Sequence, residues 1–251
     1  MNIVEKIWKT NIKNQLILVL SIFAAVGMFQ LGIRNSLPQL VISVTTAIGL
    51  DSLIIYKKLK KPFFSTSALI SGLIIALALP PGIAWHIPLS AASIAIFSKH
   101  TIHIRGRHNF NPANFGLLLS MFIFGTYLAW WGATNTWLVL LLGTLITYRF
   151  KRIHLVLSFF ITQSILLGTY FVLKGEPFLN SILMINLFFI FVMLIEPKTS
   201  PIHRKGRIIY GVLTGAFSSV LIATIPTLDP SVVALALSNL LVPVINSKVK
   251  E

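Results

Sequence analysis

Residues 15–33 read QLILVLSIFAAVGMFQLGI, a run of 19 residues without a charged side chain. A helix of about 20 apolar residues is long enough to cross a bilayer. The run follows Lys6, Lys9 and Lys13, and no small-residue cleavage site comes after it. It is therefore predicted to be a first membrane span and not a cleaved signal.

The same apolar pattern recurs along the whole chain. Hydrophobic residues make up 55% and charged residues 11% of its 251 residues, whereas a soluble domain carries about 25% charged residues. We predict an all-α polytopic membrane helix bundle that forms a single integral membrane domain, 1–251. The ten predicted spans are 15–33, 37–56, 64–80, 83–98, 112–131, 134–148, 153–172, 178–195, 208–225 and 230–246. The fourth, sixth and tenth are candidates for tilted, partial or broken helices.

The basic residues predict how these spans are oriented. The net charge of +15 comes from short clusters between apolar runs, which is typical of topology signals facing anionic lipid and argues against a nucleic-acid partner. With the N-terminus inside, 19 of the 21 Lys and Arg fall in cytoplasmic segments, leaving only Arg34 and Lys174 outside. We therefore expect the lipid bilayer as partner, a bacterial cytoplasmic (inner) membrane location, and cytoplasmic N- and C-termini.

Ten spans divide into five plus five, and an odd number per half gives the halves opposite orientations. Inverted repeats of this kind build a site at their interface. The predicted halves are 1–132 and 133–251. Asn111-Pro112 opens the fifth span and Asp229-Pro230 opens the tenth, although an ordinary Asx-Pro helix start accounts for both equally well.

The loop before the fifth span combines positive charge with a helix start. Asn111 suits an N-cap and Pro112 the first helical position. Free backbone N–H groups and the helix dipole would then lie beside Arg105 and Arg107, a combination that holds anions such as phosphate. By spacing alone, a capped helix after a positive-inside loop is the commoner explanation.

One acidic residue lies at a predicted membrane edge. Glu196, in the segment EPKTSP (196–201), is the only acid in a stretch of 52 residues. It could bind a cation, relay a proton, or pair with a base such as Arg105, Arg107 or Lys198, and pairing is the commonest of these roles.

Other polar residues lie inside the predicted spans. Asp51 is predicted to pair with Lys57 or Lys58, with a cation or proton site as the alternative. Three amides are predicted to hydrogen-bond from helix to helix, with cofactor or ion contacts as the minority interpretation: Gln163, Asn186 and Asn239.

The composition also excludes several kinds of chemistry. The chain has no cysteine, so it holds no disulfide and no cysteine-bound iron–sulfur centre. Its six histidines fall at predicted span ends or in loops, and we expect no metal site. Phosphate-loop, zinc and serine–histidine–aspartate patterns are missing, so no catalytic residue is assigned. An organic cofactor is the simplest electron carrier left.

Several motifs, in order, resemble the NqrB/RnfD family. They are SALISGLIIALALPP (67–81), Lys99 followed by Gly106 and FNPA (110–113), EPKTSP (196–201) followed by Gly206-Arg207 and Tyr210-Gly211, and ALALSNLLVP (234–243). The family comprises membrane subunits of the sodium-translocating NADH:quinone oxidoreductase and of the Rnf electron-transport complex. The short chain is similar to the compact UnbU-like branch, whose members are described as hypothetical transporters.

The resemblance implies a flavin, FMN or riboflavin, and other subunits as partners. Family members attach FMN to the threonine of a Ser-Gly-Ala-Thr motif on the outer side, and the nearest match is Trp-Gly-Ala-Thr (131–134). Thr134 is thus the covalent candidate, although tryptophan replaces the serine and the long preceding segment is missing. The alternative is a turn with Trp130 and Trp131 as an interfacial anchor. A noncovalent flavin is predicted at Arg105, Arg107, Asn109, Asn111, Asn114, Glu196, Lys198 and Thr199.

The sequence is compatible with three functions. The favoured one is a flavin-binding membrane subunit of an electron-transport complex coupled to ion transport. The second is a cofactor-free transporter or channel for a small solute with the same bundle. The third is a scaffold subunit whose small residues serve helix contacts with partners or within its own core: Gly72, Ala91, Ala92, Gly211 and Gly215.

Overall fold

The computed structural model describes residues 11–104, 107–225 and 227–249. These residues are helical apart from one antiparallel pair of two-residue strands, β1 (His103–Ile104) and β2 (Arg107–His108), and the connecting turns. The chain divides into two compact units, residues 1–101 with 115–142 and residues 102–114 with 143–251. Helices α6 (Pro112–Phe124) and α7 (Thr136–Arg149) each contribute to both units.

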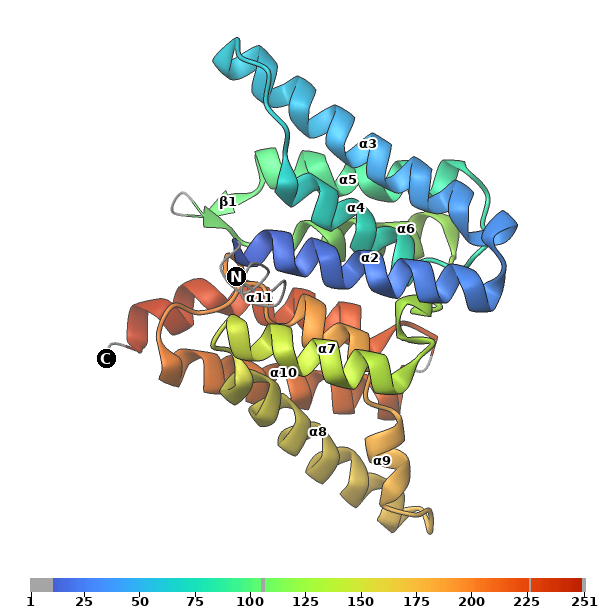
Figure 1. The fold of residues 1–251 in the computed structure, drawn as a ribbon. Coiled ribbons are helices and arrows are strands. Elements are labelled where there is room, and N and C mark those ends of the chain that lie inside the picture. The colour runs from blue at the N-terminus through green and yellow to red at the C-terminus, as the bar shows by residue number, and fades with distance from the viewer. Residues whose placement is uncertain (1–10, 105–106, 226, 250–251) are drawn as a thin grey trace, which may run out of the picture. The chain divides into compact units, whose positions relative to one another are not determined.

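The first unit contains α2 (Ile12–Leu31), α3 (Ile33–Leu59), α4 (Thr66–Ala78), α5 (His86–Thr101) and the short helix η1 (Trp131–Ala133). Gly32 separates α2 from α3 with a φ of 89°, a conformation that glycine adopts without steric cost. Figure 1 shows α3, α4 and α5 side by side. Gly72 lets α4 lie directly on α3, because an added Cβ would meet Val44 Cα at 2.8 Å.

The second unit contains α8 (Ile153–Leu173), α9 (Leu179–Leu183), η2 (Phe189–Met193), α10 (Arg204–Thr224) and α11 (Pro230–Lys248). Helix α10 packs on both α8 and α11. It approaches α8 at Gly211 and Gly215, where an added Cβ would meet Leu155 O at 2.6 Å and Phe159 O at 2.9 Å. These two glycines, like Gly72, therefore pack the chain's own core.

Five helices in the described part of the chain are long and apolar enough to cross a membrane: α2, α3, α8, α10 and α11. Helices α4, α6 and α7 are shorter apolar helices. Large apolar side chains also lie on the outside, including Phe29, which is 92% exposed. Such surfaces suit contact with lipid, since water would make them costly.

Each predicted span coincides with helical structure, but two predictions were wrong in detail. The fifth helix ends at Phe124, not at residue 131. The eighth span is interrupted between α9 and η2, where Asn186 Oδ1 accepts a hydrogen bond from Phe189 N at 2.9 Å. Asn186 thus caps a helix start, where a bond between helices was predicted, because an Asx side chain competes well for free N–H groups.

Candidate functional site

In the first unit, α4 ends in the interior and its last carbonyls are satisfied by other segments. Gln39 Nε2 on α3 donates to Ala76 O at 2.8 Å and to Leu79 O at 3.0 Å. The indole of Trp131 also donates to Ala76 O, and two backbone N–H groups, at residues 129 and 130, donate to Ala78 O. These bonds fix the turn that carries Thr134 to the end of α4.

The turn at residues 130–134 places two of the predicted residues differently. Trp131 is only 2% exposed and packs on Gly27, so the predicted interfacial anchor is wrong for this residue. Thr134 directly follows η1 and its side chain is exposed. The threonine hydroxyl is therefore accessible on a turn that the buried tryptophan holds in place.

Asp51 lies within α3 with its side chain fully buried. Its two carboxylate oxygens are occupied by α5: Lys99 Nζ lies 2.7 Å from Oδ2, and His100 Nε2 lies 2.6 Å from Oδ1. Lys99 also donates to Ser67 Oγ at 2.9 Å. The predicted partners Lys57 and Lys58 are wrong, since both lie exposed in the last turn of α3.

Buried asparagines precede α6 in the second unit. Asn111 caps α6 as predicted, accepting from Asn114 N at 3.1 Å, and Pro112 is the first helical residue. Asn114 Nδ2 donates to Val232 O at the start of α11 at 3.0 Å. Asn109, Asn111 and Asn114 are 4%, 2% and 0% exposed. Asn114 therefore fastens the first turn of α6 to α11, and the three buried amides do not form an open surface.

The segment 196–201 folds back on itself. Ser200 Oγ donates to Glu196 O at 2.8 Å, and Thr199 Oγ1 lies 3.4 Å from a carboxylate oxygen of Glu196. Thr199 and Ser200 are buried, whereas Lys198 is exposed.

A buried polar cluster joins α10 to α11. Tyr210 Oη donates to Asn239 Oδ1 at 2.6 Å, and Thr214 lies 2.8 Å from Ser238 Oγ. All four side chains are at most 1% exposed. The prediction that Asn239 bonds from helix to helix is confirmed. Gln163 is also buried, and its Oε1 has no hydrogen-bond partner among the described residues.

The structure therefore brings together some predicted residues and leaves others apart. All described residues of the predicted noncovalent site belong to the second unit, whereas Thr134 belongs to the first. Arg105 and the side chain of Arg107 lie outside the described residues. Sequence reasoning missed the contact of Asp51 with Lys99. Its signal was a carboxylate about one turn inside the end of the second predicted span and a lysine directly after the end of the fourth.

Comparison with known proteins agrees with these motifs. The model of the NQR2, RnfD, RnfE family matches residues 4–139 and 131–251, two segments that together cover almost the whole chain. The chain belongs to the NQR2, RnfD, RnfE family. It is also similar to a subunit of the ion-translocating oxidoreductase complex of Methanosarcina acetivorans, with 27% identity over 244 residues, covering 85% of this chain and 81% of that protein.

Family membership and the apolar helices together identify an integral membrane protein with several helical spans. The motifs that carry the resemblance have structural roles in the second unit. The FNPA motif contains the Asn111 cap, and the EPKTSP motif forms the folded segment beside α10. Gly206, which follows that motif, packs on Pro201, where an added Cβ would meet Pro201 Cβ at 3.1 Å.

Proposed function

We propose that this chain is the membrane subunit of an ion-translocating electron-transport complex and that it works with other subunits. The observation that carries the proposal is the match to one family along almost the whole chain. The similar Methanosarcina protein is named as a subunit of an ion-translocating oxidoreductase complex. The first test is mild detergent extraction of native membranes with the chain tagged. Co-purifying redox subunits support the proposal, and a chain that always purifies alone contradicts it.

Within the membrane, the proposal includes ten spans in two inverted halves, 1–132 and 133–251, with both termini in the cytoplasm. The third element of each half departs from a full span: α4 has 13 residues, and α9 and η2 have five each. Asn111 and Asp229 cap the last helix of each half in the same way.

The proposed cofactor is a flavin, with Thr134 as the site of a phosphoester to FMN. The fit rests on accessibility, because Thr134 is exposed and follows a helix turn held by the buried Trp131. Asn109, Asn111, Asn114 and Thr199, the noncovalent candidates, are at most 4% exposed and mostly bonded to the backbone or to Glu196. A bound flavin would supply one- and two-electron transfer.

A flavin assay on purified protein tests this part separately. We expect a fluorescent band in a denaturing gel, lost in Thr134→Ala and retained in Thr136→Ala. Thr136 is a matched control, because it is an exposed threonine two residues further along the chain. Flavin released on denaturation would contradict the covalent link and move the site to the second unit. Protein that binds no flavin, even with added FMN or riboflavin, would contradict a redox role.

A cofactor-free transporter is the second candidate, and the interrupted eighth segment favours it. Helix interruptions at membrane depth commonly form solute sites in transporters, and Gln163 and Asn239 each have a buried polar atom without a partner among the described residues. The test is sodium-22 uptake by proteoliposomes that contain only this chain. Uptake without flavin or partner subunits would support the transporter, and its absence would leave the redox subunit as the better explanation.

A further inference from the structure

Two arginines from different helices meet on one carbonyl in the second unit. Arg152 Nη1 lies 3.3 Å from Pro201 O, and Arg207 Nε lies 3.2 Å from the same oxygen. Arg207 also donates to Ile202 O. Two like charges are thus held side by side, at the start of α8 and in the first turn of α10.

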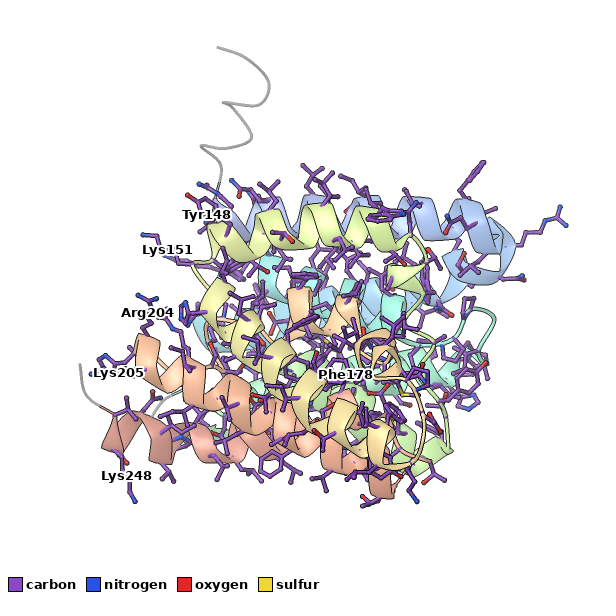
Figure 2. The ribbon with its side chains drawn as sticks, turned by 90° about the horizontal axis from the view of Figure 1, so that it is seen from below. Tyr148, Lys151, Phe178, Arg204, Lys205 and Lys248 are labelled. Carbon is purple, nitrogen blue, oxygen red and sulfur yellow. The ribbon has the colours of Figure 1, made fainter. Side chains whose placement is uncertain are left out.

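A third arginine and a histidine complete this group. Arg204 lies three residues before Arg207 on α10, so the two share a helix face. Together with Arg152 they form the arginine cluster, and their three positive charges act on the imidazole of His154. His154 Nε2 is buried and has no hydrogen-bond partner among the described residues. Figure 2 shows Arg204 at one end of the second unit, together with Lys151 and Lys205.

The backbone adds positive potential at the same place. Helices α8 and α10 both begin here, and their N-cap residues, Arg152 and His203, make no side-chain cap hydrogen bond. The free N–H groups and the dipole of a helix start favour an anion. The intervening segment is fixed from α11, because Asn246 Oδ1 accepts from Ile202 N at 3.0 Å.

Membrane topology alone does not explain this arrangement. Positive-inside signals act from the loops and need no burial, as the exposed Lys205 illustrates. Arg152 is only 6% exposed, and burying a guanidinium beside another one is costly. Residues 149–152 and 196–207 together hold seven basic residues and one acid, Glu196. This excess of positive charge around a buried guanidinium therefore indicates a site for an anion.

We propose that the arginine cluster, with His154 and the starts of α8 and α10, binds a phosphate group at the membrane surface. The planar guanidinium presents paired donors that match phosphate oxygens. Exposed apolar side chains adjoin the cluster in the sequence, among them Ile153, Ile202 and Ile208. A phospholipid headgroup and a free phosphate both carry this chemistry, and experiment distinguishes them.

The experiment uses the full chain, purified in detergent and stripped of lipid. Binding is followed by the thermal midpoint and by native mass spectrometry with three probes: phosphatidylglycerol, inorganic phosphate and phosphatidylcholine. The test variant is Arg204→Gln, since the Arg204 side chain has no hydrogen bond or ion pair within the described part of the chain. The matched control is Lys205→Gln, which removes one exposed charge from the next position.

We expect Arg204→Gln to weaken binding of the preferred probe by roughly tenfold, the usual effect of losing one charge-assisted hydrogen bond. Lys205→Gln should change it less than about twofold. Preference for phosphatidylglycerol assigns a lipid headgroup, and preference for inorganic phosphate assigns a soluble ligand. Equal losses in the two variants would overturn the site in favour of diffuse surface charge. Phosphatidylcholine carries a phosphate whose charge its own choline neutralises, so failure of both net-anionic probes to bind better than phosphatidylcholine would overturn the site outright.

Discussion

The buried carboxylate of Asp51 gives the sharpest test of how the first unit is held together. Asp51→Asn keeps the size of the side chain but removes its charge. The wild-type carboxylate accepts from Lys99 at 2.7 Å and contacts His100 Nε2 at 2.6 Å. The amide would offer a single neutral oxygen and would turn its NH2 group toward one of these donors. The variant therefore leaves Lys99 as an uncompensated charge.

The magnitude follows from the burial of the three side chains. Breaking a buried ion pair by removing one partner costs about 3–5 kcal/mol. Lys99 and His100 are 11% and 17% exposed, so both keep some access to water when the carboxylate is lost. The lower end of the range applies, and we expect Asp51→Asn to reduce the free energy of unfolding by about 3 kcal/mol.

The assay is reversible unfolding in mixed micelles, followed by tryptophan fluorescence, to which Trp131, buried in the same unit, contributes. The double variant Asp51→Asn/Lys99→Met removes the orphaned charge as well. It should recover more than half of the lost stability, because the cost of Asp51→Asn comes mainly from the unpaired ammonium. A loss below about 0.5 kcal/mol in Asp51→Asn, within the range of ordinary surface substitutions, would refute the reasoning. So would a double variant less stable than the single one.

Three further predictions concern packing and topology. Gly211→Ala should cost about 1–3 kcal/mol by overpacking the contact between α8 and α10, whereas Gly49→Ala, with nothing within 4 Å of an added Cβ, should be neutral or slightly stabilising in the same unfolding assay. Trp131→Phe should cost about 1–3 kcal/mol, because it leaves a buried carbonyl with one donor fewer. Because the chain has no cysteine, single substitutions report topology directly: in intact cells, an impermeant maleimide should label Lys174→Cys and spare Lys205→Cys, and the reverse pattern would contradict cytoplasmic termini.

Sequence reasoning succeeded where a structural feature depends on neighbours along the chain. Asn111 and Asp229 cap α6 and α11 as expected, because an Asx side chain before proline satisfies N–H groups only two or three residues away. The partner of Asp51 could not be found in this way. Lys57 was favoured by proximity in sequence, but the actual partner is 48 residues away on α5, and only tertiary packing brings them together.

Polar residues inside apolar runs gave the most ambiguous signal. Asn239 bonds to Tyr210 on a neighbouring helix, but Asn186 caps the start of a helical segment within its own span. The two environments look alike in sequence, because each amide lies within a mostly apolar run. What separates them is whether the helix is continuous. The sequence leaves that open, because leucine and phenylalanine suit a continuous helix as well as an interrupted one.

Two helix ends inside the apolar segments, the end of α4 and the interruption at Asn186, need hydrogen-bond partners for their backbone groups. At 13 residues, α4 is about 20 Å long, shorter than the roughly 30 Å hydrocarbon core of a bilayer. Free backbone groups inside a membrane are tolerated only if protein satisfies them. Gln39 donates a hydrogen bond to a carbonyl at the end of α4, and Asn186 accepts one from a free N–H group at the interruption in the second unit. The NH2 group of Gln39 and the side-chain oxygen of Asn186 are therefore occupied by backbone groups at helix ends. The buried atoms without a partner among the described residues of the second unit include Gln163 Oε1, Ser164 Oγ and Asn239 Nδ2. These atoms have hydrogen-bonding capacity left for a polar ligand.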